Sequence, residues 1–324
     1  MSTTLNSGID PASFSAVTGP AQDLFRYVNG PWIDMYRLPD DRSRYGSFDK
    51  LAEDAENQIR EILEDDDCPA EKSHALYASF LDVDAINASG LAAIEDQLKA
   101  IDVAADKAEL TRSLGAMNPA GGPDLIGIAV YGDPGAPETN IIHIEQSGLG
   151  LPDEAYYRED HYAPIREAYV DMVAKQLKNA KLAADDEQAE AQAQRFLDVE
   201  TRIAANHWDN VATRDSVKTY NPTDYAELSG MLADYDLDTW IDAWQTAYDQ
   251  TSAAQVQPLD FRGIFNHVVV HEPSFLTGLN AFWKAADLDD LKLWARVHVI
   301  IGSTLELPHE FDETNFEFYG KTLS

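Results

Sequence analysis

Two neighbouring arginines are the side chains of this sequence best suited to binding chemistry. Arg42 and Arg44 lie between an aromatic-rich stretch and a stretch with helical periodicity, in a chain that has only 24 lysines and arginines. A guanidinium group can hold a carboxylate through two parallel hydrogen bonds, so an arginine fixed in such a bend is well placed to bind an anion. The alternative is an ordinary surface ion pair with a nearby Asp or Glu.

Two segments begin like a zinc-binding helix but do not complete it. An H-E-x-x-H helix binds zinc through two histidines on one face, and its glutamate acts as the general base. Residues 271–275 read HEPSF, so Phe275 stands at the position of the second histidine and Pro273 would disrupt the helix. Residues 309–313 read HEFDE and end in an acid instead. Neither segment is expected to bind zinc.

Other arrangements of catalytic groups are not recognisable either. Glu200 and His207 are seven residues apart on one predicted helix, but zinc helices use histidines four apart and no third ligand accompanies this pair. His143 lies in a predicted strand without a second histidine or carboxylate at a matching spacing, so we interpret it as a core or edge residue. No Ser-His-Asp or Cys-His arrangement is present. We therefore expect no catalytic residue and no metal ligand in this chain.

The hydrophobic pattern predicts the elements on either side of the two arginines. Downstream, a helix with Ser47 as its N-cap is predicted, because apolar residues recur at the helical period at Phe48, Leu51, Ala55, Ile59 and Ile62. Upstream, large aromatics crowd around the sequence Asn-Gly-Pro at 29–31, which predicts a sharp turn where the chain folds back on an apolar cluster.

The remainder of the chain is predicted to be mainly helical. Helical patterns extend over about 70–83, 90–100, 107–117, from 164 onward, and over 186–207, 223–232, 237–248, 274–284 and 288–305. In the first of these, Leu76, Phe80 and Val83 are expected to face inward. Branched residues in 125–131 and 140–146 flank a Gly- and Pro-rich link and predict a β-hairpin, and a further strand is predicted at 265–271.

These patterns define the expected fold class and domain organisation. The fold class is mainly α, a multi-helix lobe with a small β-hairpin or sheet near 125–146. We expect one domain over 1–324, in which 1–47 form an extended anchoring segment and 48–324 form the helical lobe. The stretch at 252–258 is too short to separate two mobile domains.

Several segments, in order along the chain, carry a family resemblance. They read DLFRYVNGPW at 23–32, SRYGSFD at 43–49, SGLGLPDEAYY at 147–157, FLDVETRIA at 196–204 and FYG at 318–320. In this order and spacing they resemble the amino-terminal half of the neprilysin and endothelin-converting-enzyme family of zinc metalloendopeptidases. The resemblance covers nearly the whole chain.

The resemblance implies that this chain is the non-catalytic lobe of a two-lobed peptidase. In that family the amino-terminal part closes over the zinc domain and leaves a chamber that limits substrates to short peptides. The catalytic zinc domain is then expected downstream and absent here, with zinc as the cofactor of the parent enzyme and its ligands outside this chain. The implied partners are the chain's own downstream catalytic domain and short peptide substrates, and we expect this chain alone to be inactive.

The resemblance also assigns one substrate-binding residue. The arginine of the family's Ser-Arg-Tyr segment, Arg44 here, faces the carboxyl-terminal end of the bound peptide. A second arginine that helps in neprilysin would fall at Ala52, which implies a weaker dependence on a free peptide carboxylate. Residues 280–282 read NAF, like the segment with which the family holds its substrate backbone, but they lie within a helical pattern, and we interpret them as core.

Composition restricts the partners and the compartment. The 57 acidic and 24 basic residues give a formal charge of -33, which repels nucleic acid phosphates and anionic membranes, so neither is an expected partner. Cys68 is the only cysteine, and no apolar run that could act as a signal peptide or membrane anchor is visible at the amino terminus. A soluble, cytoplasmic, bacterial-type member of the family is the expectation.

One alternative from a different class remains open at this stage. A peptide- or protein-binding module without catalytic activity, derived from such a peptidase, would have the same sequence features. The reading frame beyond Ser324 distinguishes the two, because an H-E-x-x-H motif there favours the enzyme and a stop codon favours the module.

Overall fold

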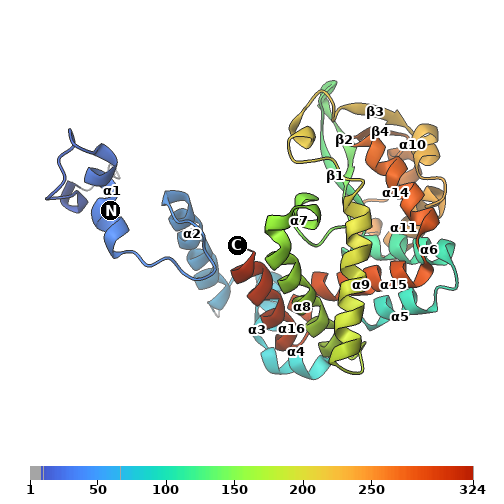
Figure 1. Cartoon of the computed structure of the whole chain (residues 1–324), viewed down its shortest axis with the longest axis horizontal. Helices are drawn as coiled ribbons and strands as arrows, with labels where there is room; N and C mark the ends of the chain where they lie inside the picture. Colours follow the sequence, from blue (N-terminus) through green and yellow to red (C-terminus); the bar gives the residue numbers. More distant parts are fainter. Residues whose placement is uncertain (1–8, 10, 66, 324) are drawn as a thin grey trace. The chain divides into compact units, whose positions relative to one another are not determined.

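The computed structural model describes residues 9, 11–65 and 67–323, which divide into two compact units. The amino-terminal unit ends at Asp65, and the second unit extends from there to Leu323. Both units are drawn in Figure 1, where the amino-terminal unit is blue. The boundary between the units lies at the end of a helix, whereas the predicted change from the anchoring segment to the helical lobe lies at residue 47, and the domain organisation stays a prediction.

Within residues 9 and 11–65, the amino-terminal unit contains one short 3-10 turn and two helices. The turn is η1 (Pro11–Ser13), and the helices are α1 (Leu24–Met35) and α2 (Ser47–Glu64). Helix α2 confirms the predicted helix, although Gly46 and not Ser47 is its N-cap. The segment expected to be extended therefore carries a helix of its own.

Helix α1 shows that the predicted turn at 29–31 is wrong. The helix continues through Pro31, which has no N–H to donate to the carbonyl of Tyr27 four residues earlier. That carbonyl instead accepts a hydrogen bond from the backbone N–H of Ser15 at 2.7 Å. The preceding loop thus supplies the donor that the proline lacks, and the helix tolerates the proline in its interior.

The second unit consists mainly of helices packed around a small sheet. Its α-helices are α3 (Glu71–Leu81), α4 (Val83–Ser89), α5 (Glu95–Val103), α6 (Lys107–Met117), α7 (Ala155–Arg158), α8 (Ala163–Asn179), α9 (Asp186–Ala204), α10 (Tyr225–Met231), α11 (Leu237–Asp249), α12 (Ser252–Val256), α13 (Phe261–Ile264), α14 (Pro273–Ala285), α15 (Leu288–Gly302) and α16 (His309–Asn315). The short helical turns are η2 (Asn118–Ala120), η3 (Asp160–Tyr162), η4 (Ala212–Arg214), η5 (Thr304–Glu306) and the π-helical η6 (Phe316–Thr322). The mainly helical fold class is confirmed.

In the described part of the chain, four strands form one sheet. They are β1 (Ile126–Asp133), β2 (Ala136–Gln146), β3 (Asn221–Asp224) and β4 (His267–Val270), in the order β1-β2-β4-β3. Strands β1 and β2 form the predicted antiparallel hairpin, β4 pairs parallel with β2, and β3 pairs antiparallel with β4. Figure 1 shows the sheet near one end of this unit, beside α10 and α14.

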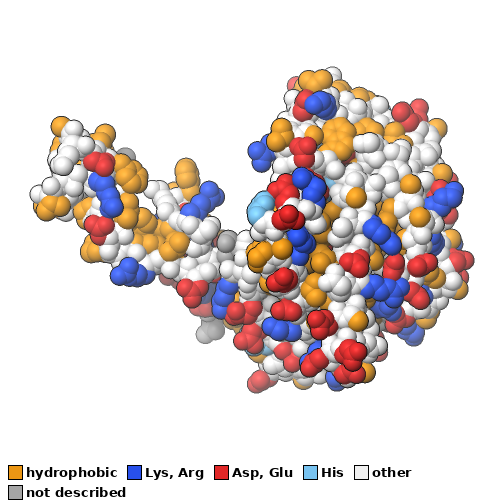
Figure 2. Space-filling model, viewed as in Figure 1, with side chains coloured by type: hydrophobic (Ala, Val, Ile, Leu, Met, Phe, Trp, Pro, Cys, Tyr) orange, Lys and Arg blue, Asp and Glu red, His pale blue; other side chains and the backbone are white. Residues whose placement is uncertain are grey.

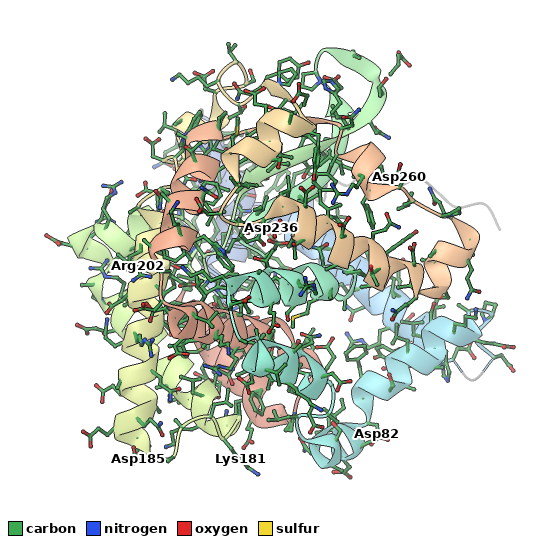
Figure 3. All side chains as sticks on the ribbon, turned by 90° about the vertical axis from the view of Figure 1, so that its right-hand side faces the viewer. Asp82, Lys181, Asp185, Arg202, Asp236 and Asp260 are labelled. Atoms are coloured by element: carbon green, nitrogen blue, oxygen red, sulfur yellow. The ribbon has the colours of Figure 1, made fainter. Side chains whose placement is uncertain are left out.

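Aspartates begin many of the helices of the second unit. Their carboxylates accept hydrogen bonds from backbone N–H groups in the first helical turn, which otherwise have no partner. In Figure 3, Asp82, Asp185, Asp236 and Asp260 mark the starts of α4, α9, α11 and α13. Lys181, also labelled there, has a φ of 57° and turns the chain between α8 and α9. Some of the excess acidic residues of the chain therefore cap the N-termini of helices.

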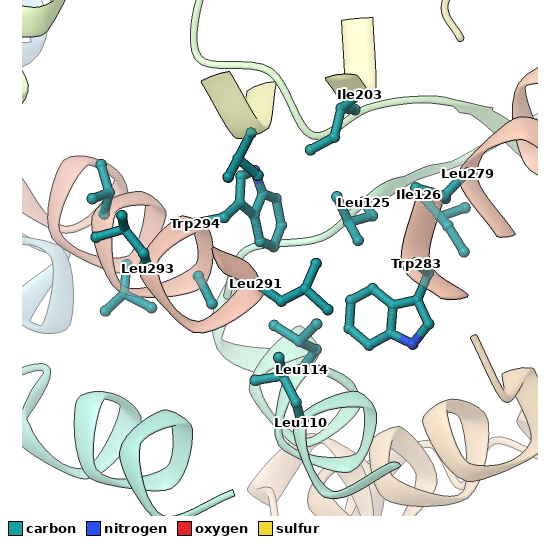
Figure 4. Packing of buried hydrophobic residues seen from close by; sticks show 14 of the residues in the cluster. Leu110, Leu114, Leu125, Ile126, Ile203, Leu279, Trp283, Leu291, Leu293 and Trp294 are labelled. Carbon is teal, nitrogen blue, oxygen red and sulfur yellow. The ribbon is translucent and has the colours of Figure 1, made fainter. Parts of the chain in front are cut away.

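One hydrophobic core extends through the second unit. Figure 4 shows Trp283 of α14 and Trp294 of α15 packed among leucines and isoleucines from α6, β1 and α9. Both tryptophans are almost completely buried. Burying a large apolar side chain stabilises the fold by about 1.5–3 kcal/mol, so this core is sufficient to fix the helices around the sheet.

Two details of the early helices differ from the sequence prediction. Leu76 and Phe80 of α3 and Val83 of α4 were expected to face inward, but all three are exposed. The helix predicted at about 90–100 begins at Glu95, because Gly90 has a φ of 58° and ends α4. Among the described residues, no helix combines the length and the apolar character that a membrane crossing requires.

Candidate substrate-binding segment

Arg42 and Arg44 lie on the non-helical segment that leads into α2, and the two side chains have different surroundings. Arg42 lies between two carboxylates, with Nη1 3.8 Å from Asp49 and Nη2 3.9 Å from Glu53. Arg44 is exposed, and its side chain makes no ion pair within residues 9, 11–65 and 67–323. Arg42 therefore forms ordinary surface ion pairs with its own chain, whereas Arg44 remains available for an external anion.

An aromatic stack holds the segment on which these arginines lie. The rings of Trp32, Tyr36 and Tyr45 stack on one another, with centroids 4.7 Å apart for the first two and 4.5 Å apart for the two tyrosines. Such pairs contribute about 0.5–1.5 kcal/mol beyond the area they bury. The stack connects the end of α1 to the residue that follows Arg44, so the backbone of Arg44 is fixed on that side.

Helix α2 fixes the segment on its other side. The hydroxyl of Tyr45 donates to Glu53 at 2.6 Å, and this bond is the main reason why the pKa of Tyr45 is raised well above its usual range. The N–H of Gly46 donates to Asp49 at 2.7 Å and completes the helix N-terminus. The neighbours of Arg44 are therefore held, while its guanidinium group stays free to move.

The first of the two zinc-like segments is occupied with structural contacts. Nδ1 of His143 and Nε2 of His271 are hydrogen-bonded at 2.8 Å, and Glu145 lies 3.7 Å from the other ring nitrogen of His271. Glu272 accepts from the N–H of Gln146 at 3.0 Å, and burial raises its pKa to about 7. Phe275 is fully buried in the core. These residues do not fit a zinc site.

The second zinc-like segment begins helix α16. The N–H of His309 donates to the side chain of Asn87 at 2.8 Å, and Phe311 is buried in the core. Among the described residues, no three or more His, Cys, Asp or Glu side chains are grouped so that they could hold a metal ion. Within the part of the chain that the structure describes, neither zinc-like segment therefore offers a donor set that fits zinc.

The remaining candidates have structural roles as well. Glu200 is fully buried and accepts from the N–H of Gly150 at 2.8 Å and from the hydroxyl of Tyr157 at 2.7 Å, while Nε2 of His298 lies 2.8 Å from the same carboxylate. His207 does not contact Glu200. Its Nε2 lies 3.0 Å from the carbonyl of Ser147, and burial lowers its pKa to about 4.

The NAF segment lies within helix α14, as the sequence predicts, but only Phe282 of its three residues is buried in the core. The side-chain oxygen of Asn280 accepts from the N–H groups of Asp234 and Tyr235 at 2.7 and 3.2 Å, and Phe282 is buried. This half-buried amide ties α14 to the loop before α11, and its Nδ2 also donates to Asp234 at 3.0 Å, so both its oxygen and its nitrogen have partners within the chain.

Sequence reasoning missed the contact between His143 and His271. The two residues are 128 positions apart and come together only because β2 and β4 pair in parallel, with His143 opposite Val269. A parallel pairing between distant strands has no local signal in the sequence, since both strands are short apolar runs.

The fold and the candidate site together define the class of this protein: a mainly helical lobe with a small sheet and an exposed arginine, Arg44, on the segment that leads into α2. The sequence model of Peptidase family M13 matches residues 20–324. The chain therefore belongs to Peptidase family M13.

Individual relatives agree with this assignment. The chain is 25% identical to human neprilysin over 321 residues and 24% identical to endothelin-converting enzyme 1 of Cavia porcellus over 297 residues. These alignments cover 90% and 87% of this chain but only 42% and 38% of the relatives. The chain thus spans less than half the length of the relatives that it matches.

Solved structures agree with the fold. The zinc metalloprotease Zmp1 of Mycobacterium tuberculosis, in complex with an inhibitor, superposes with a TM-score of 0.84 at 32% identity, over 98% of this chain and 47% of that chain. The same protease in its open state gives a TM-score of 0.72. PepO of Lactobacillus rhamnosis is 18% identical with a TM-score of 0.73, which is a likeness of fold alone.

Proposed function

We propose that this chain is the substrate-binding and substrate-gating amino-terminal part of a zinc metalloendopeptidase that hydrolyses short peptides. The observation that carries the proposal is the match to Peptidase family M13 over residues 20–324, supported by the structural likeness to a zinc metalloprotease over 98% of the chain. The zinc and the groups that activate its water belong to the remaining part of the parent protein. This chain by itself does not hydrolyse peptides.

Arg44 is the substrate-binding residue of this part. Its guanidinium group is exposed and unpaired in the described structure, and a peptide carboxylate offers the two acceptor oxygens that match its fork of donors. The net charge of -33 repels a negatively charged peptide carboxylate. An arginine without a carboxylate partner of its own can offset this repulsion and hold the peptide. Arg44 binds and orients the carboxyl-terminal end of the peptide, and the chemistry takes place elsewhere.

A comparison of the parent protein with this chain tests the proposal. The complete protein and residues 1–324 are incubated separately with a mixture of short peptides, and the products are identified by mass spectrometry with and without a zinc chelator. We expect cleavage by the complete protein that the chelator abolishes, and none by residues 1–324. Cleavage by residues 1–324, or a parent gene without a zinc motif, would contradict the proposal and favour a non-catalytic binding module.

A further inference from the structure

Two histidines from distant parts of the second unit share one hydrogen bond at the sheet. His143 lies on β2 and is buried, and His271 directly follows β4. Nδ1 of His143 and Nε2 of His271 are 2.8 Å apart, and the rings meet edge to face with their centroids 5.1 Å apart. The backbone N–H of His271 also donates to the carbonyl of Ile144 at 2.8 Å, so the pair closes the end of the parallel ladder between β2 and β4.

This hydrogen bond has room for one proton between the two rings. A neutral imidazole has one donor and one acceptor nitrogen, whereas both nitrogens of an imidazolium ion are donors. Two neutral rings can therefore form the bond, and one neutral and one protonated ring can form it at the cost of burying a charge. Two protonated rings would place two N–H groups and two positive charges against each other, so the bond is then lost.

The surroundings of the pair favour one tautomer. Nε2 of His143 is buried and has no hydrogen-bond partner among the described residues. A proton on this nitrogen would be a buried donor without an acceptor, which destabilises the folded state. Nδ1 of His143 therefore carries the proton and donates to His271. The proton of His271 is then on its Nδ1, 3.7 Å from Oε1 of Glu145.

The neighbouring strands bring one carboxylate to the pair. The ring of Tyr131 on β1 packs edge-on against His143, with the centroids 5.3 Å apart. Glu145 on β2 is partly exposed, and at 3.7 Å it compensates a charge on His271 only in part. On β3, Nδ2 of Asn221 lies 3.5 Å from the carbonyl of His271 and carries no charge. A second proton on the pair is therefore poorly compensated.

Two further titratable groups lie at the start of α14. Glu272 is buried and accepts from the N–H of Gln146 at 3.0 Å, and burial raises its pKa to about 7. Its contribution to stability is therefore lost as the pH rises, and it opposes any opening in acid. His207, on the loop after α9, packs against Phe275 of α14, and burial lowers its pKa to about 4.

We propose that His143 and His271 form a pH-sensitive clasp. While the hydrogen bond between the rings exists, the clasp holds the corner between β4 and α14 against the hairpin of β1 and β2, and protonation of both rings opens this corner. The clasp is a conformational device of the second unit and goes beyond the function proposed above.

The pH range of the opening follows from burial and charge. Figure 2 shows Asp and Glu side chains spread over the drawn face of the second unit, and the formal charge of the chain is -33. A negative field favours the protonated form of a histidine. Burial nevertheless lowers the pKa of His271, Glu145 opposes this shift, and His143 adds to it. The clasp is therefore closed at neutral pH and opens as the pH falls below 6.5.

Nitrogen-15 NMR of the imidazole rings in residues 1–324 tests the clasp without any substitution. At pH 7.5 we expect His143 to carry its proton on Nδ1 and to show a scalar coupling to Nε2 of His271 across the hydrogen bond. The coupling should disappear as both rings become protonated in acid. A proton on Nε2 of His143, or a coupling that persists after both rings are protonated, would overturn the proposal.

Amide hydrogen exchange at residues 268–271 measures the opening itself. After correction for the intrinsic pH dependence of exchange, protection of these amides relative to those of α9 should fall at least tenfold between pH 7.5 and 5.0. His143→Gln combined with His271→Gln should reduce this change to less than about twofold, because an amide side chain does not titrate. His207 and Glu272 are present in both proteins, so their effects cancel in the comparison.

His267→Gln is the matched control, because His267 also lies on β4 but is exposed. Its protection at 268–271 should change with pH as in wild type. Protection in wild type that does not depend on pH, or an equal fall in the double variant, would refute the clasp. If the double variant does not fold, the ring NMR of the wild-type chain decides alone.

Discussion

Arg42 and Arg44 are two residues apart, yet only Arg42 is held by carboxylates of its own chain. Asp49 and Glu53 lie 3.8 and 3.9 Å from its guanidinium nitrogens, and both belong to the first two turns of α2. Within the described residues, Arg44 has no such partner. The pairing of the first arginine uses the nearby carboxylates, and so it leaves the second one available for a ligand.

Arg44→Ala in the complete parent should weaken hydrolysis of peptides with a free carboxyl terminus. Losing one partner of a desolvated charge pair costs about 2–4 kcal/mol, so kcat/KM should fall by roughly 30- to 900-fold. Peptides amidated at the carboxyl terminus should be cleaved at nearly the same rate by both proteins, because they offer no carboxylate. The measurement is steady-state kinetics on matched free and amidated peptides.

Arg37→Ala provides the control for loss of charge, because Arg37 is also exposed and also has no ion pair in the described structure. It should change neither rate by more than about twofold, as expected for an exposed charge. A loss of activity in Arg44→Ala that is equally large for free and amidated peptides would show that the residue does not bind the carboxylate.

The sequence predicts those elements of the fold whose causes are local. Helix α2 and the hairpin of β1 and β2 follow from the spacing of their own apolar residues. The turn at 29–31 was wrong because the stabilising donor, Ser15, comes from a separate loop. Strand β3 was missed because it is four residues long, contains Pro222 and exists only through its pairing with β4.

The candidate site likewise has features that the sequence predicts and features that it does not predict. The resemblance assigns a substrate-binding role to Arg44, and this role stays a prediction. It does not show that Arg44 lacks a partner among the described residues, because this depends on the α2 carboxylates lying next to Arg42. The exposure of the apolar side chains of α2, such as Phe48 at 86%, could not be predicted at all. An amphipathic pattern shows that a helix has an apolar side, and not whether the same chain covers it.

Glu200→Gln should destabilise the second unit by about 2–4 kcal/mol. The fully buried carboxylate joins three donors, Tyr157, His298 and the N–H of Gly150, and an amide has one acceptor oxygen fewer. Leaving a buried donor without its partner costs about 1–3 kcal/mol, and more for a charged group. Urea unfolding of residues 1–324, followed by tryptophan fluorescence, measures the change.

Glu190→Gln on the same helix is the control for Glu200→Gln, because Glu190 is exposed. Its effect should stay within about 0.5 kcal/mol, as is usual for surface substitutions. Equal midpoints for wild type and Glu200→Gln would show that the buried carboxylate does not stabilise the fold.

Gly115→Ala should separate α6 from α11. Gly115 is buried, and a Cβ at this position would overlap the backbone carbonyl of Trp240, which cannot move without shifting α11. Overpacking of this kind costs about 1–3 kcal/mol. Gly230→Ala in α10 is the opposite case, because Gly230 is exposed with open space around it, and it should stabilise the fold by about 0.5–1 kcal/mol. The midpoint temperature of thermal unfolding should therefore be lower than that of wild type for Gly115→Ala and higher for Gly230→Ala.

His207 should make the stability of the second unit depend on pH. Burial lowers its pKa from 6.5 to about 4, and its ring lies at an edge of Phe275 with the centroids 4.7 Å apart. The imidazole of His207 is therefore protonated near pH 6.5 in the unfolded chain, but only near pH 4 in the folded chain. His207 makes its full contribution to the free energy of unfolding above pH 6.5. This free energy decreases as the pH falls, by about 2 kcal/mol at pH 5 and about 3 kcal/mol at pH 4.

His207→Gln removes this titration and isolates its effect. Glu272, whose pKa is raised to about 7, changes stability in the opposite direction over part of this range, but it is present in both proteins and cancels in their difference. Urea unfolding of both proteins at several pH values between 7.5 and 4.5 should give a difference in free energy that shrinks as the pH falls. Parallel profiles would mean that the imidazole of His207 titrates in the folded chain as it does in the unfolded chain, and that its burial does not control the protonation.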